Sequence, residues 1–192
     1  AVFIGIIGNS LATFSKRIST DIEFYSFESR FTKYAVKDYL IDQLFVQLAL
    51  NTLIFLVVLA FATSLLNFRV MSNLVVQFFL LMVMGIYFSI IGFVLGVRVD
   101  AKTLDTLSFP VIIMASMTII PFASLGGDGR FVDIVSKIQM IFPGYYYSDI
   151  VTSLSSGNAI DSKDVLLFIT VFILNIIPLY FLVTRVRTIK DR

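Results

Sequence analysis

The stretch from Pro110 to Asp149, PVIIMASMTIIPFASLGGDGRFVDIVSKIQMIFPGYYYSD, decides the fold of this chain. It starts as a hydrophobic span and breaks at a glycine-rich run, Gly126-Gly127-Asp128-Gly129. In the piece that follows, apolar residues recur at positions 131, 134, 135, 138, 141 and 142, the spacing of a helix with one apolar face. This piece is too short and too polar to cross a bilayer, which takes about 20 apolar residues. We therefore predict a membrane helix followed by a half-length amphipathic helix that lies at the interface or turns back into the membrane. The three tyrosines that follow it, Tyr145, Tyr146 and Tyr147, suit the membrane–water interface.

The composition indicates an integral membrane protein. Of the 192 residues, 58% are hydrophobic and only 15% are charged, whereas soluble domains are about 25% charged. The chain has no cysteine, histidine or tryptophan, which excludes disulfides, thiol catalysis and most zinc or haem sites. No basic face interleaves with aromatic residues in a polar segment, so nothing predicts nucleic-acid binding.

Four segments have the length and composition of membrane helices: 43–66, 74–97, 107–125 and 165–184. None carries a charged residue in its middle. We expect the polar residues Asn51, Gln77 and Asn175 to bond between helices, a role we favour over substrate contact. In the second span, the GxxxG pair Gly92 and Gly96 favours close packing against another helix.

The chain is apolar from Ala1 onward, and the segment 1–14 is too short to span a bilayer. No basic region precedes it, as a signal peptide would require. We expect this segment to be the end of a membrane helix, with at least one further span before it in the natural protein.

The segment 15–42 is the longest polar stretch. Phe24, Phe27 and Phe31 recur at helical spacing in it, with Glu28, Arg30 and Lys33 among them. An amphipathic helix here either lies on the lipid surface or docks a soluble partner, and the sequence favours neither alternative. In the second case the phenylalanines are the anchors and the charged residues form a rim.

Positive charge near the ends of the spans predicts the orientation. Eleven lysines and arginines fall in 15–42, 98–106 and the tail after 184, whereas four fall in the turn 67–73 and the connection 126–163. The first group is therefore expected in the cytoplasm and the second group outside. The spans contain no ionisable residue that could couple transport to an ion gradient. The chain also has no phosphate-binding loop. Any uphill transport would need a separate energy-supplying subunit.

This order of elements resembles the membrane subunit of ABC-2 type ABC transporters. That family has six membrane helices, a cytoplasmic segment between the second and third, and a re-entrant extracellular hairpin between the fifth and sixth. By the resemblance, 1–14 is similar to the end of the second helix and 15–42 to the coupling segment. The four spans are similar to helices three to six, and 185–192 to the cytoplasmic tail. The stretch from Phe142 to Asp149 looks like the end of the family's hairpin.

The resemblance implies an all-α transmembrane bundle, without its first helix, that acts as the permease of an ATP-driven exporter in the cell membrane. The chain would have no catalytic, metal or cofactor site, because ATP and Mg²⁺ belong to a partner ATPase. Two permease subunits, identical or different, would pair in the lipid bilayer. The coupling residues would be Phe24, Phe27, Glu28, Arg30, Phe31 and Lys33, and the hairpin residues Gly126, Gly127, Gly129, Pro143, Tyr147 and Asp149. The alternatives are a structural or assembly protein of the membrane that does not transport, and a fragment of a secondary transporter.

Overall fold

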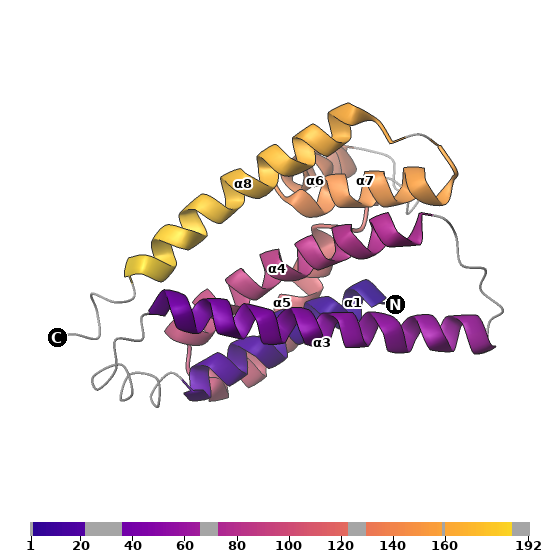
Figure 1. Ribbon diagram of the computed structural model, residues 1–192. Coiled ribbons are helices and arrows are strands. Elements are labelled where there is room, and N and C mark those ends of the chain that lie inside the picture. The colour runs from indigo at the N-terminus through magenta and orange to yellow at the C-terminus, as the bar shows by residue number, and fades with distance from the viewer. Residues whose placement is uncertain (1, 22–35, 66–72, 123–129, 159, 186–192) are drawn as a thin grey trace.

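The chain folds as a bundle of helices (Figure 1). The computed structural model describes residues 2–21, 36–65, 73–122, 130–158 and 160–185, and all regular structure within these ranges is helical. The N-terminal helix, 2–21, consists of α1 (Val2–Ile7), the π-helical segment η1 (Gly8–Thr13) and an α-helical stretch at 14–21. The other helices are α3 (Val36–Leu65), α4 (Leu74–Arg98), α5 (Ala101–Met117), α6 (Arg130–Gln139), α7 (Pro143–Ser155) and α8 (Ser162–Arg185). The predicted all-α class is confirmed.

Three of the described helices are long and apolar enough to cross a membrane. The qualifying segments are Asp38–Leu65, Leu74–Arg98 and Ser162–Leu182, which include nearly all of three of the four predicted spans. Helix α3 begins at Val36, ahead of the predicted start at 43, because no proline or glycine interrupts the polar residues before that point. These helices mark the chain as a membrane protein.

The predicted bounds of the third span, 107–125, differ from the helix in the structure. Helix α5 begins earlier, because the carboxylate of Asp100 accepts a hydrogen bond from the Thr103 backbone N–H and caps it. It ends at Met117, shortly before Pro121, whose ring disfavours helical geometry in the residue that precedes it. At 17 residues, α5 is about 25 Å long, short of the ~30 Å of a bilayer core.

The predicted boundary at 14/15 also differs from the structure, because the N-terminal helix continues to residue 21. Phe14 and Ile18 are both buried in a cluster with Phe93 of α4. The intervening Ser15 donates a hydrogen bond to the Leu11 carbonyl, so its polar side chain does not interrupt the helix. Packing against α4 therefore extends the helix into the polar stretch.

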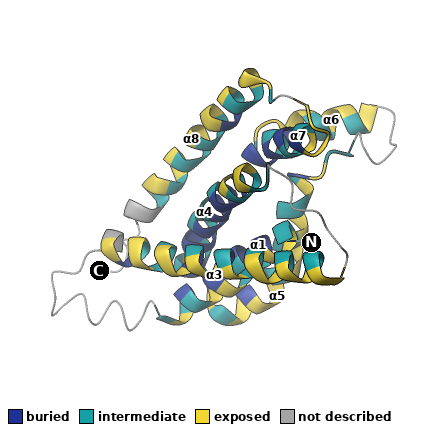
Figure 2. Cartoon of the chain, turned by 45° about the vertical axis from the view of Figure 1, so that its right-hand side comes forward, coloured by how far each residue is buried: buried dark blue, intermediate teal, exposed yellow. Residues whose placement is uncertain are grey.

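Helix α4 lies at the centre of the bundle, as its buried surface in Figure 2 shows. The predicted close approach at Gly92 and Gly96 is confirmed. A Cβ atom on Gly92 would lie 2.3 Å from the Ser10 carbonyl oxygen, and one on Gly96 would lie 2.4 Å from that of Ser15. The N-terminal helix therefore packs with its backbone directly against α4.

A group of polar side chains joins the N-terminal helix to α3 inside the bundle. Asn51 is fully buried, and its Oδ1 accepts a hydrogen bond of 3.1 Å from Asn9 Nδ2. The amides of Asn51 and Gln47 donate to the Ser10 hydroxyl at 3.4 and 3.3 Å. The predicted interhelical role of Asn51 is confirmed.

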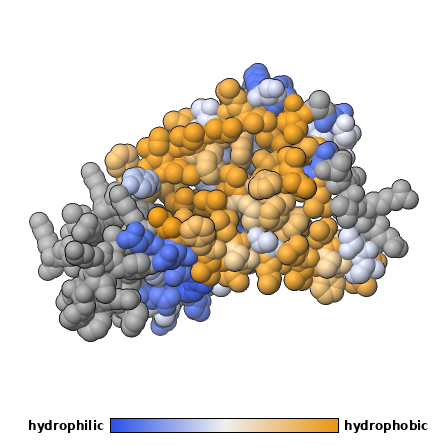
Figure 3. Space-filling model, viewed as in Figure 1, coloured by the Kyte–Doolittle hydropathy of each residue, from blue (hydrophilic) through white to orange (hydrophobic). Residues whose placement is uncertain are grey.

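The outer surface carries an apolar belt between two polar ends. Figure 3 shows hydrophobic side chains over α3, α4 and α8, with hydrophilic residues toward both ends of the bundle. We call the end that holds Lys16, Arg17, Arg98 and Lys102 the basic end. The opposite end, where α4 and α8 begin and α7 ends, is the hairpin end (Figure 1). This is the two-sided arrangement of polar segments on which the charge argument depends.

Candidate functional site: the α6–α7 hairpin

The hairpin of α6 and α7 is built around a sharp change of direction at Pro143. Phe142 is extended, with φ −104° and ψ 142°, and Pro143 occupies the first turn of α7, where its missing N–H costs nothing. The amphipathic helix predicted from Phe131 to Phe142 forms as α6 but ends at Gln139. The second helix, α7, was not predicted, because the three tyrosines after Gly144 were interpreted as membrane-interface residues.

The start of α7 packs on the broken end of α5. A Cβ atom on Gly144 would lie 2.4 Å from Ile119 Cγ1 and 3.1 Å from the Thr118 carbonyl oxygen. Any larger residue here would displace the Ile119 side chain and press on the Thr118 backbone. The junction between α6 and α7 is therefore held against the point where α5 stops.

Gln139 closes the same junction from α6. Its side chain is only 4% exposed, and its Nε2 donates hydrogen bonds to the carbonyls of Met117 and Ile120, the latter at 2.8 Å. These carbonyls lie where α5 has ended and would otherwise need a partner. Sequence reasoning missed this residue, although an amide next to the apolar face of a short amphipathic helix was a visible signal.

The junction is also hydrogen-bonded to α8 near the middle of that helix. Asn175, near the middle of α8, donates a 2.9 Å hydrogen bond to the Ile141 carbonyl, and its Oδ1 accepts a 3.4 Å bond from the Tyr87 hydroxyl of α4. The predicted interhelical role of Asn175 is confirmed. At the other end of the hairpin, Asn73, just before α4, donates to the Leu154 carbonyl at 3.3 Å. Helix α7 therefore extends from the hairpin end to about halfway along the bundle.

The predicted hairpin residues of α7 are placed in different environments. Pro143 is fully buried, and Tyr147, at 7% exposed, stacks on Phe3 with ring centroids 4.8 Å apart. The interpretation of Tyr147 as an interface residue is wrong, since its ring is in the core and burial raises the pKa of its hydroxyl. Asp149 is half-buried, and this burial, with a smaller contribution from the charge of Asp164, raises its pKa.

The remaining predicted site residues lie outside the described part of the chain. These are the hairpin glycines Gly126, Gly127 and Gly129 and the coupling residues Phe24, Phe27, Glu28, Arg30, Phe31 and Lys33.

At the basic end, the first residues of the predicted coupling segment, 15–42, are bonded to neighbouring helices. The Lys16 ammonium and the Asp105 carboxylate form an ion pair at 2.7 Å, and the Ser19 hydroxyl donates to the Val99 carbonyl at 2.8 Å. Arg17 donates to the Gln43 side chain of α3. Asp100 caps α5, and the hydrogen bonds that it accepts from the Thr103 hydroxyl and backbone N–H lower the pKa of its carboxyl.

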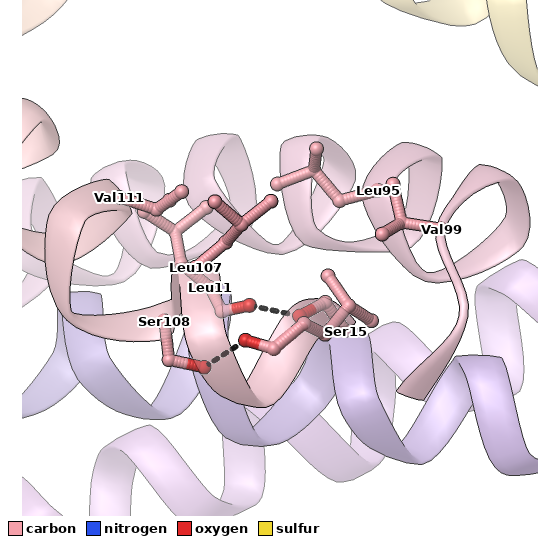
Figure 4. Close-up of a pocket in the computed structure, with 8 residues that line it drawn as sticks. Leu11, Ser15, Leu95, Val99, Leu107, Ser108 and Val111 are labelled. Carbon is pink, nitrogen blue, oxygen red and sulfur yellow. Dashed lines mark hydrogen bonds between the residues drawn. The ribbon is translucent and has the colours of Figure 1, made fainter. Parts of the chain in front are cut away.

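Two cavities adjoin α5. A small one of about 30 Å³ lies between the N-terminal helix, α4 and α5, and Figure 4 shows that both of its serines, Ser15 and Ser108, bond to backbone carbonyls. A much larger pocket, of about 640 Å³, lies beside the hairpin between α4, α5 and α6. Its walls are almost entirely apolar and include Ile91, Met114, Ala115, Phe131, Val135 and Phe142.

The described residues hold no group of histidine, cysteine, aspartate and glutamate side chains that is suited to a metal ion. No protein-family model matches this sequence, and no curated protein and no solved structure matches it.

Proposed function

We propose that this chain is the permease subunit of an ABC-2 type exporter, which forms a substrate path through the cell membrane and is driven by a separate ATPase. The observation that carries the proposal is the α6–α7 hairpin. Helix α5 stops short, and the chain returns through two short helices whose junction is bonded to the middle of α8. A re-entrant hairpin between the fifth and sixth helices is the feature that the resemblance to this family implies.

The backbone contacts of the hairpin support a position at membrane depth. Hydrocarbon offers no hydrogen bonds, so non-helical backbone at that depth must be bonded within the protein. Gln139 supplies partners for the carbonyls at the end of α5, and Asn175 supplies one for Ile141. Side-chain partners of this kind would be unnecessary if the junction lay in water.

The proposed energy source is a partner at the basic end. The chain carries no phosphate-binding loop, so ATP and Mg²⁺ would be bound by an ATPase subunit. In the sequence, residues 22–35 connect the N-terminal helix to α3, and these two helices are linked by the bond from Arg17 to Gln43. A partner that moves this segment would therefore act directly on two helices. In this proposal the basic end is cytoplasmic, the hairpin is extracellular, and a second permease subunit completes the path.

The experiment compares the wild type with the Phe27→Ala/Phe31→Ala double variant, each coexpressed with candidate ATPase subunits and then reconstituted. We expect an ATPase to copurify with the wild type and to bind the variant about 1–3 kcal/mol more weakly, a loss of hot-spot size. Stimulation of ATP hydrolysis should fall in parallel. The matched control is Phe61→Ala/Phe79→Ala, which removes two exposed phenylalanines from α3 and α4, away from the coupling segment. Unchanged copurification and stimulation in the coupling variant would reject the proposed role and favour a membrane structural protein.

A further inference from the structure

The large pocket beside the hairpin has the size of a ligand site. Its volume of about 640 Å³ lies within the ~300–1,000 Å³ typical of pockets that bind small molecules. Its wall is formed by α4 on one side and by α5 and α6 on the others, with aromatic side chains and methionines prominent in it. Methionine fills irregular apolar space and adapts to different occupants.

The polar side chains in this wall already donate hydrogen bonds to other groups of the protein. Tyr87 donates to Asn175, Thr118 donates to the Ala115 carbonyl, and Gln139 donates to two carbonyls at the end of α5. The Gln139 Oε1 atom is buried and has no partner among the described residues, but it has no hydrogen to offer. Among these residues the wall therefore offers an occupant no free N–H or O–H group. A ligand that needs hydrogen-bond donors would lose its bonds to water here without replacement, whereas hydrocarbon would not.

The pocket is flanked by side chains that face the surroundings of the protein. Phe131 of α6 and Met114 of α5 line it and are also 72% and 68% exposed. Other exposed apolar residues follow on both helices, such as Ile113 and Ile134. In a membrane protein, apolar side chains exposed in this way meet lipid tails. Apolar walls that are left uncovered would forfeit dispersion contacts, and they offer few hydrogen-bonding partners to water.

We infer that this pocket binds an acyl chain of a membrane phospholipid, which enters from the bilayer between α5 and α6. The occupant packs beside Ala115 and Phe142, against the end of α5 and the start of α7. A bound lipid chain then forms part of the hairpin's support. The inference does not rest on the proposed export function, since it depends only on the walls of the pocket and on the membrane around them.

The test is fluorescence quenching by a brominated lipid, because the chain contains no tryptophan. Two single-tryptophan reporters are made: Phe142→Trp in the pocket wall and Phe61→Trp on the exposed face of α3. Phosphatidylcholine with brominated acyl chains is titrated into the purified full chain in detergent micelles. We expect the Phe142→Trp signal to saturate at a lipid fraction at least tenfold below that needed for Phe61→Trp. Unbrominated phosphatidylcholine should restore the fluorescence by displacement.

A blocking variant tests the location. Ala115→Leu places a larger side chain in the pocket and should raise the lipid fraction for half-quenching of the Phe142→Trp reporter at least fivefold. Ala60→Leu, the same change on the exposed face of α3, should leave it unchanged. Parallel, unsaturated quenching of both reporters overturns the inference, and so does an Ala115→Leu curve equal to that of Ala60→Leu. If a second copy of the chain or another protein segment fills the pocket, the Phe142→Trp reporter is not quenched, which also overturns it. If Ala115→Leu does not fold, the quenching curves of the two reporters and the displacement by unbrominated phosphatidylcholine still test whether the pocket binds lipid.

Discussion

At the scale of single residues, the side-chain amide of Gln139 connects α6 to the end of α5. It binds two carbonyls left at the end of α5 while it lies in the last turn of α6, just ahead of α7. Gln139→Leu keeps a similar volume but leaves both carbonyls without this donor. We expect the free energy of unfolding to fall by about 1–3 kcal/mol, the cost of leaving buried polar groups unpaired. Thermal unfolding in detergent measures the change.

The matched control for this prediction is Gln77→Leu. Gln77 is half-buried on α4 and makes no side-chain hydrogen bond to the described residues, unlike its expected interhelical role. The same substitution there should change stability by no more than about 0.5 kcal/mol. Equal losses at the two positions would show that Gln139 stabilises the protein only as any buried glutamine would.

At the scale of helices, the contact between α4 and the N-terminal helix depends on the missing side chain at Gly92. In Gly92→Ala the new methyl group would meet the Ser10 carbonyl at 2.3 Å, so the two helices must separate. We expect a loss of about 1–3 kcal/mol from this overpacking, measured by thermal unfolding. Gly5→Ala in α1 is the control, because its new methyl group would meet only the Ile54 side chain at 3.6 Å, an ordinary contact. That variant should be neutral or more stable by up to about 1 kcal/mol, the gain in helix propensity; equal behaviour of the two variants would contradict the prediction.

At the scale of the whole molecule, the two polar ends should lie on opposite sides of the membrane. The chain has no cysteine, so single cysteines can report the sides. Ser156 is exposed at the hairpin end and Thr20 at the basic end. We expect a membrane-impermeant thiol reagent to modify Ser156→Cys in intact cells and Thr20→Cys only after permeabilisation, as the eleven-to-four charge bias predicts. The reverse pattern would invert the orientation, and labelling of both in intact cells would contradict the two-sided arrangement.

The long spans were predictable from sequence because hydropathy over about 20 residues reports membrane helices directly. The close packing at Gly92 was predictable because small residues four apart are a recognised helix-packing signal. The end of α5 was not, since the residues around Met117 are as apolar as those before them, and the break depends on Pro121 together with contacts from Gly144 and Gln139. Those contacts join residues far apart in the chain. Tyr147 was misplaced for the same reason: its ring meets Phe3, at the other end of the sequence.

The π-helical segment η1 sets the angle at which the residues after it face around the N-terminal helix. The Phe14 N–H bonds to the Asn9 carbonyl, five residues back instead of four, so the segment holds more residues per turn than an α-helix. Winding the same residues as a regular α-helix would turn everything after them by about 100°. Asn9 and Ser10 would keep their partners on α3, while Phe14, Ser15 and Ile18 would swing away from α4. The two halves of this helix therefore contact different neighbours, and a related chain that lacks one residue within 11–13 should wind this segment as a regular α-helix and keep both sets of contacts.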